Sequence, residues 1–170
     1  KSAVQILRME VWVTNRTGAT TNTRDIVGLM DLGEQKPFQQ PPIINPIPGQ
    51  TLPSNGSNDL YSNIINNPTS RNPEMIGNNL TGLGLLPVRD YERTFARKLD
   101  STQYFFNRQL GFISLNITVQ PDEVLAVAYQ YTVNGKVYQV GEFSQDIPVD
   151  STNGVQKILF LKMLKSTSQR

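Results

Sequence analysis

The chain has 170 residues and contains neither cysteine nor histidine. This composition excludes disulfides, zinc fingers, thiolate nucleophiles and Ser-His-Asp triads, and we expect no metal and no other cofactor. The 16 lysines and arginines barely exceed the 14 aspartates and glutamates and form no basic stripe, so we expect no nucleic-acid partner. No apolar run approaches the roughly 20 residues of a transmembrane helix, and the length suits a single domain, residues 1–170.

The first strand pattern lies at residues 7–14. Apolar and polar side chains alternate there, which places one apolar row on one face of a strand. That row consists of Leu7, Met9, Val11 and Val13. Trp12 falls in the opposite, polar row. The apolar residues of 24–32 fit a short helix and a strand equally well.

The segment 37–90 differs from the rest in composition, because it holds nine of the eleven prolines. Proline removes backbone donors and favours extended chain, so we expect an inserted excursion that runs over the surface. Two short helices are expected within it. One would be capped by Asn58 and stopped by Pro68, and the other would start at Asn72 and end at Gly82.

The clearest pattern is a hairpin in the C-terminal half of the chain. Two strand-like runs flank Asn134-Gly135, the dipeptide that best tolerates the positive φ angles of a type I′ turn. A two-residue turn sets the register, in which Tyr131 lies opposite Tyr138. Aromatic pairs of this kind stabilise antiparallel strands.

Strand patterns also occur at 113–119 and at 158–164, the latter apolar on both faces as in a core strand. With at least five strands and little helix, the chain is expected to be mainly β. We expect an antiparallel β-sandwich or jelly-roll-like domain with a long Pro/Asn-rich excursion at 37–90. We also expect the strands at 7–14 and 158–164 to be neighbours that close the fold.

Carboxylates are the remaining route to acid-base catalysis. The carboxylates that occur in pairs lie beside turn residues or arginines, which favours a role in solvated turns and ion pairs. We therefore do not expect the protein to be an enzyme. These pairs are Asp31 and Glu34, Asp90 and Glu92, and Asp122 and Glu123. Glu142 falls on an apolar row of the hairpin. It is either buried beside a cation, Arg97 or Lys98, or open to water at the sheet end, which we favour.

Trp12 has two interpretations. In the first, Trp12 stacks on a carbohydrate, and the chain is a carbohydrate-binding β-sandwich module of a secreted or surface protein. In the second, which we favour, Trp12 packs against 37–90. Ordered proline-rich loops on a rigid sheet commonly carry binding sites, so this excursion is also a candidate contact region. The candidate protein-contact residues are Pro41, Pro42, Ile43, Pro46, Pro48 and Trp12.

Six sequence blocks between Arg8 and Thr167 carry a family resemblance. The blocks are RMEVWVTNR at 8–16, TRDIVGLMDLGE at 23–34, DYERTFARKL at 90–99, QLGFISLN at 109–116, DEVLAVAYQYTVNGKVYQVGEFS at 122–144 and LFLKMLKST at 159–167. Together, and in this order, they resemble the SprA/Sov family. Its members are the gliding-motility cell-surface proteins that form the outer-membrane translocon of the type 9 secretion system.

The resemblance implies a non-enzymatic role in protein export and gliding motility. Family members are very large outer-membrane β-barrels that pass folded substrates to the cell surface. This chain would be one soluble domain of such a protein, in the periplasm or at the cell surface, acting in assembly, gating or substrate contact. Its expected partners are other domains of the parent translocon, the plug protein, the lateral-gate partner and secreted substrates. It would meet the membrane only through the parent barrel.

Two short stretches also match a modification pattern of the bacteria that carry this secretion system. Asp-Ser-Thr occurs at 100–102 and again at 150–152. Both stretches resemble the short O-glycosylation motif of those bacteria, in which a hydroxyl residue follows aspartate. We therefore keep both as candidate modification sites.

Overall fold

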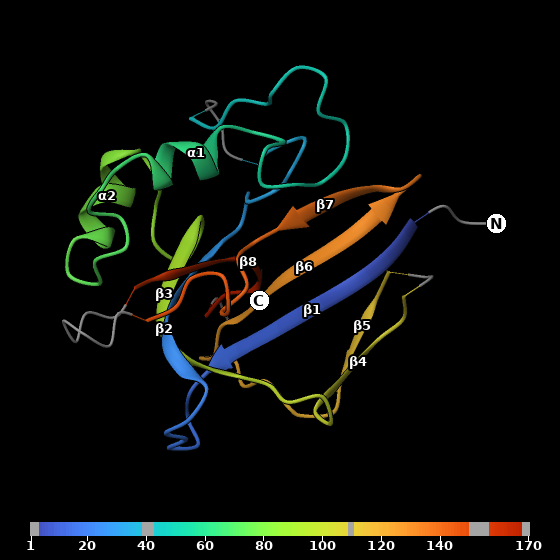
Figure 1. Ribbon diagram of the computed structural model, residues 1–170. Coiled ribbons are helices and arrows are strands. Elements are labelled where there is room, and N and C mark those ends of the chain that lie inside the picture. Colours follow the sequence, from blue (N-terminus) through green and yellow to red (C-terminus); the bar gives the residue numbers. More distant parts are fainter. Residues whose placement is uncertain (1–3, 39–42, 109–110, 150–156, 168–170) are drawn as a thin grey trace.

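Figure 1 shows the computed structural model, which describes residues 4–38, 43–108, 111–149 and 157–167. This part of the chain is mainly β, with two short helices. The strands are β1 (Val4–Thr14), β2 (Thr23–Leu29), β3 (Tyr91–Lys98), β4 (Tyr104–Phe106), β5 (Ile113–Leu115), β6 (Leu125–Val133), β7 (Lys136–Val140) and β8 (Leu159–Lys165), and the helices are α1 (Leu60–Ile65) and α2 (Ile76–Gly82). No helix in the described ranges is long and apolar enough to cross a membrane.

Six of the strands form one sheet that closes on itself. Their order is β1–β3–β2–β8–β6–β7, and β1 also pairs with β6. The prediction of a mainly β, sandwich-like domain is therefore confirmed. The sheet is mixed, since β2 and β8 run parallel while the other pairs are antiparallel. The expected pairing of the first and last strands is wrong, because β1 lies between β3 and β6 while β8 lies between β2 and β6.

The interior of the closed sheet is filled by Trp12 together with small and aliphatic side chains. Trp12 is 1% exposed, and its Nε1 donates a hydrogen bond to Glu10 at 3.2 Å. A Cβ atom added at Gly28 would lie 3.1 Å from Cβ of Met163, so this wall of the interior has no room for a larger residue. The buried neighbours of Trp12 are Ile26, Ala96, Ala126, Ala128, Phe143, Leu159 and Leu161. Trp12 thus packs inside the sheet, and the expectation that it packs against 37–90 is wrong.

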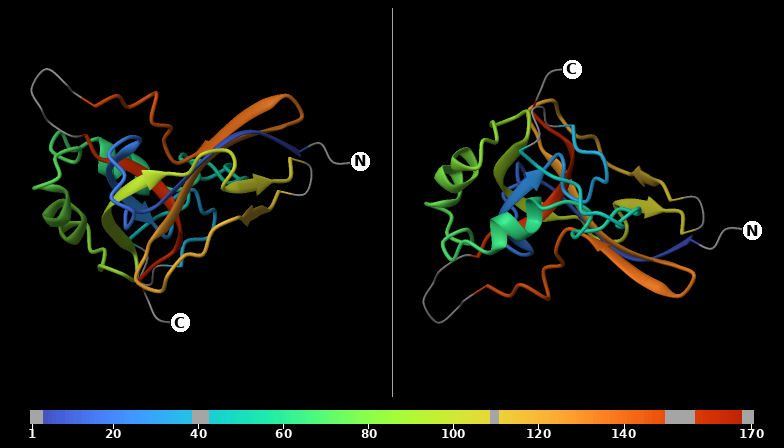
Figure 2. Two further views of the ribbon diagram at one scale, coloured as in Figure 1. Left: turned by 90° about the horizontal axis from the view of Figure 1, so that it is seen from below. Right: turned by 90° about the horizontal axis from the view of Figure 1, so that it is seen from above.

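Two layers cover the outside of the sheet, as Figure 2 shows. Helices α1 and α2 lie on one side, where their apolar residues join those of β2 and β8. The β4–β5 hairpin lies on the other side, against β1 and β6. Strand β1 therefore has both faces covered, which explains why Val11 and Val13 are as well buried as Trp12.

Both expected helices are present in the excursion, but their expected starts are wrong. The N-cap of α1 is Asp59 instead of Asn58, that of α2 is Met75 instead of Asn72, and neither makes a side-chain capping hydrogen bond. The side-chain oxygen of Asn58 accepts the backbone N–H of Leu60 at 2.9 Å in the turn that leads into α1. The side-chain oxygen of Asn72 accepts the N–H of Glu74 at 2.7 Å in the turn that leads into α2. Each helix buries two apolar side chains, so 37–90 completes the core in addition to running over the surface.

The hairpin has the expected register. Tyr131 pairs with Tyr138, and their rings stack with centroids 5.3 Å apart. Asn134 and Gly135 both have positive φ angles, 51° and 82°, as a type I′ turn requires. The open choice at 24–32 is settled in favour of a strand, β2.

The predicted apolar row of the first strand is wrong at its start. The pairing of β1 with β6 shifts register between Ile6 and Arg8, which is the signature of a β-bulge. Because of the bulge, Ile6 lies on the same face as Met9 and is 7% exposed, whereas Leu7 is 36% exposed. Alternation alone does not reveal a bulge, because the extra residue changes which face each later side chain occupies.

Replacing Trp12 by alanine will empty much of the interior of the closed sheet. We expect Trp12→Ala to lower the free energy of unfolding by about 3–5 kcal/mol, measured by urea denaturation. The control is Phe105→Ala on β4, because Phe105 is 61% exposed and its loss should change stability by less than about 0.5 kcal/mol. Equal losses in the two variants would contradict a buried Trp12.

Candidate functional site

The structure separates the candidate contact residues into two groups. Pro46 and Pro48 are exposed on one loop, with Ile47 between them at 38% exposure, and Ile43 is partly buried nearby. Trp12 lies inside the closed sheet, so its assignment as a contact residue is corrected: a side chain that is 1% exposed has no surface to offer a partner. The remaining two candidates, Pro41 and Pro42, lie outside the described residues.

The loop that carries the exposed prolines, residues 44–59, is here called the contact loop. Its two arms are joined by backbone hydrogen bonds, from Ile47 N to Ser57 O at 3.0 Å and from Asp59 N to Asn45 O at 2.9 Å. The carboxylate of Asp59 in turn accepts the backbone N–H of Asn45 at 2.8 Å. The base of the contact loop is therefore closed by bonds in both directions.

Two asparagines fasten the contact loop to the sheet and its connections. Asn58 Nδ2 donates to the carbonyls of Asp31 and Glu34, at 2.9 and 2.8 Å. Asn55 donates to the carbonyl of Gly141 at 3.0 Å and accepts the N–H of the same residue at 2.8 Å. The loop thus presents its prolines from a fixed backbone.

A tyrosine and an isoleucine complete this attachment. The hydroxyl of Tyr131 on β6 donates to the carbonyl of Pro53. Ile44, at the start of the contact loop, is 2% exposed and belongs to the core beneath the helices. The sequence pattern indicated the proline-rich loop but not these anchors, because asparagine and tyrosine side chains carry no signal of the distant backbone that they reach.

Glu142, just after β7, is the most completely bonded carboxylate of the described chain. It is 2% exposed, and Arg71 binds it with both terminal nitrogens, each at 2.6 Å. Its Oε1 also accepts the N–H of Phe160 at 2.8 Å, and its Oε2 accepts the hydroxyl of Tyr61 at 2.6 Å. The favoured expectation of a carboxylate open to water is wrong.

The partner of Glu142 also differs from the two that the sequence suggested. Arg97 and Lys98 lie on β3, whereas Arg71 comes from the excursion between α1 and α2. Arg71 also donates to the carbonyl of Ile158 at 2.9 Å, so it connects the excursion to the residue before β8. Only the way in which the excursion folds back over the sheet brings this arginine to Glu142.

Every oxygen of Glu142 accepts two hydrogen bonds, which gives the side chain a structural role. Burial, followed by the charge and hydrogen bond of Glu142, raises the pKa of Tyr61 well above its ordinary value, so the phenol stays protonated. The paired carboxylates considered for catalysis also bond within turns: Asp90 accepts the N–H of Leu86 at 2.7 Å, and Glu123 accepts that of Gln120 at 2.6 Å. Both are 6% exposed, so these turns are less solvated than expected.

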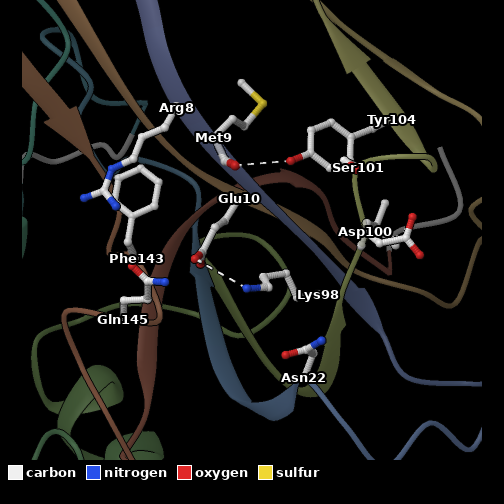
Figure 3. Close-up of a pocket in the computed structure, with 11 residues that line it drawn as sticks. Arg8, Met9, Glu10, Asn22, Lys98, Asp100, Ser101, Tyr104, Phe143 and Gln145 are labelled. Atoms are coloured by element: carbon white, nitrogen blue, oxygen red, sulfur yellow. Dashed lines mark hydrogen bonds and ion pairs between the residues drawn. The ribbon is translucent and has the colours of Figure 1, made fainter.

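A hollow of about 390 Å³ opens between β1, the end of β3 and the segment after β7 (Figure 3). The guanidinium of Arg8 lies 3.8 Å from the ring centre of Phe143 and forms one wall. On the opposite side, the hydroxyl of Tyr104 donates to the carbonyl of Met9 at 3.2 Å. Glu10 lies at the base. This hollow is not predictable from the sequence, because its walls come from segments far apart in the chain.

Of the two Asp-Ser-Thr stretches, the structure describes the one at 100–102, while 150–152 lies outside the described residues. Asp100 accepts hydrogen bonds from the hydroxyl and the backbone N–H of Thr102, which lower the pKa of its carboxyl group. Ser101 and Thr102 are both exposed. The hydroxyl of Thr102 is thus engaged within its own turn.

Removing the charge of Glu142 will leave Arg71 without its carboxylate. We expect Glu142→Gln to lower the free energy of unfolding by about 3 kcal/mol or more, measured by urea denaturation. The control is Asp146→Asn, which breaks the exposed pair with Arg8 and should cost less than about 1 kcal/mol. A loss as small as that of the control would show that Glu142 does not hold the excursion.

Stability should also decline in alkaline solution, because burial raises the pKa of Tyr129 and of Tyr131 to about 12. In the unfolded chain these phenols ionise near pH 10, so between pH 10 and 12 the folded state binds more protons than the unfolded state. Their contribution is complete below pH 10 and is lost as the pH rises through 12. Urea midpoints measured from pH 8 to 12 should therefore fall less steeply in Tyr131→Phe than in the unmodified chain. Parallel curves would exclude Tyr131 as a source of the decline.

No model of a known protein family matches this chain, and no curated protein matches it.

Proposed function

We propose that this chain is a non-enzymatic protein-binding domain that acts through the contact loop. One observation carries the proposal: the loop exposes Pro46, Ile47 and Pro48 while its arms are bonded to each other and its second arm is bonded to the connections after β2 and β7. Exposed apolar residues on a loop held by a rigid scaffold are typical of binding surfaces. The carboxylates considered for catalysis have structural partners instead.

The fixed backbone of the contact loop favours binding for an entropic reason. A flexible loop loses conformational freedom when a partner orders it, and this loss weakens binding. Pro46 and Pro48 restrict φ already, and the bonds of Asn55 and Asn58 hold the two arms in place before a partner arrives. Ile47 is then presented with little further ordering.

We further propose that the parent protein is a type 9 secretion translocon of the SprA/Sov kind, required for protein export and gliding motility. The resemblance of the six sequence blocks supports this assignment. In it, the domain lies in the periplasm or at the cell surface and acts in assembly, gating or substrate contact. Its partners are other translocon domains, the plug, the lateral-gate protein or secreted substrates, and the parent barrel provides the link to the outer membrane.

The carbohydrate-binding alternative was based on Trp12, and the position of Trp12 does not support it. A stacking platform needs an exposed aromatic face, and Trp12 is buried inside the sheet. No other described feature favours a glycan over a protein partner, so the contact loop remains the better-supported surface.

The contact loop is best tested by point substitution. A deletion of residues 41–56 would remove the exposed prolines together with the buried Ile44 and the hydrogen bonds of Asn55. A loss of binding in that variant could not be separated from a loss of stability. Ile47→Asp places a charge at an exposed position of the first arm and leaves the backbone bond of residue 47 to Ser57 in place. We expect it to reduce the recovery of translocon proteins in a pull-down by about tenfold or more, the loss typical of a central interface residue.

The matched control is Phe105→Asp, an equally disruptive change at an exposed residue on the β4–β5 side of the molecule. It should leave the pull-down unchanged, and both variants should keep the thermal midpoint of the unmodified chain. Normal recovery of partners with Ile47→Asp would exclude the contact loop as the binding surface.

A further inference from the structure

A second hollow, of about 350 Å³, lies beside the one in Figure 3 and shares Asn22 and Lys98 with it. Among the described residues that line it, Arg24 and Lys98 are cationic and none is acidic. Part of the wall is apolar and consists of Trp12, Pro148 and Val149. We call it the cationic hollow. None of the described residues that line the cationic hollow belongs to the contact loop.

Arg24 is a buried cation that makes no direct ion pair among the described residues, although the charges of Glu142 and Glu10 act on it from a distance. It is 4% exposed, and its two terminal nitrogens donate to the carbonyls of Ile147 at 2.7 Å and Lys157 at 2.5 Å. Both acceptors are uncharged. Its Nε is buried and has no hydrogen-bond partner in the described chain. A guanidinium in this position carries a desolvation cost that neutral acceptors offset only in part.

The second cation, Lys98, is also weakly paired. Its Nζ lies 3.9 Å from Oε2 of Glu10, too far for a hydrogen bond. Glu10 is already occupied, because it accepts the indole N–H of Trp12 at 3.2 Å and the backbone N–H and hydroxyl of Ser144 at 3.0 and 2.8 Å. The ammonium group of Lys98 therefore retains donors for a ligand.

The balance of these charges indicates the class of ligand. The charge of Glu142 also acts on Arg24, but Glu142 is already paired with Arg71. Glu10 lies next to the hollow and offsets about one of its two positive charges, so roughly one remains uncompensated. A carboxylate supplies one negative charge, whereas a phosphate group carries about 1.5 to 2 at neutral pH. The exposed apolar side chains of Pro148 and Val149 suit the carbon atoms attached to a carboxylate.

We propose that the cationic hollow binds a carboxylate group, carried by a small organic acid or by the C-terminal end of a peptide. Lys98 would donate to the carboxylate, Arg24 would add its positive charge without a direct bond, and Pro148 and Val149 would hold the neighbouring side chain. A volume near 350 Å³ suits one small group of this kind.

Trp12 gives the test a local signal, since it is the single tryptophan of the chain and lines the hollow. Its indole N–H resonance can be followed by ¹H–¹⁵N NMR during titration with N-acetylvaline at constant ionic strength. We expect a saturable shift with N-acetylvaline and none with N-acetylvalinamide, which has the same shape without the charge. Titration with acetate separates the two sources: equal affinity indicates small acids, and weaker affinity indicates peptide ends.

Lys98→Gln should weaken the binding of N-acetylvaline by about tenfold or more, because it removes a charge-assisted hydrogen bond. Lys36→Gln, at an exposed lysine away from the hollow, should leave it unchanged. Arg24→Gln should abolish binding if the variant folds; if it does not fold, Lys98→Gln decides. Equal binding of acid and amide, no saturable shift, or binding of inorganic phosphate alone would overturn the proposal.

Discussion

The pairing of Glu142 with Arg71 is the interaction on which the arrangement of this molecule depends. A carboxylate that is 2% exposed is tolerated only with charged and hydrogen-bonding partners, and Glu142 has four donor contacts. These come from α1, from the segment before α2 and from β8. One buried charge therefore holds the excursion, the hairpin and the last strand in a single position.

The excursion owes its fixed position to this anchor and to its own apolar side chains. Helices α1 and α2 cover one face of the sheet, and the contact loop leaves from the same region. Because the base of that loop is bonded in both directions, its exposed prolines are held in a defined place. Rigidity at the contact loop is thus a consequence of packing several residues away from it.

The parts of the structure that local sequence could predict are those governed by neighbours in the chain. The hairpin register depends on Asn134-Gly135, and the turn that leads into α1 contains a bond between Asn58 and Leu60, two residues apart. Leu7 shows where local prediction fails. The bulge between Ile6 and Arg8 arises from the pairing of β1 with β6, and it cannot be recognised from the alternation of apolar and polar residues. The anchors of the contact loop and the walls of both hollows were not predictable for the same reason, because their partners are distant in sequence.

By itself, then, the sequence determined a mainly β domain, a tight hairpin, two short helices and a proline-rich loop, since alternation, turn residues and proline act locally. Only the tertiary structure decided which strands meet, that Trp12 fills the closed sheet, and that Arg71 rather than Arg97 or Lys98 neutralises Glu142. Those outcomes depend on sheet closure and on the burial of charge, which are properties of the whole fold and of no single segment.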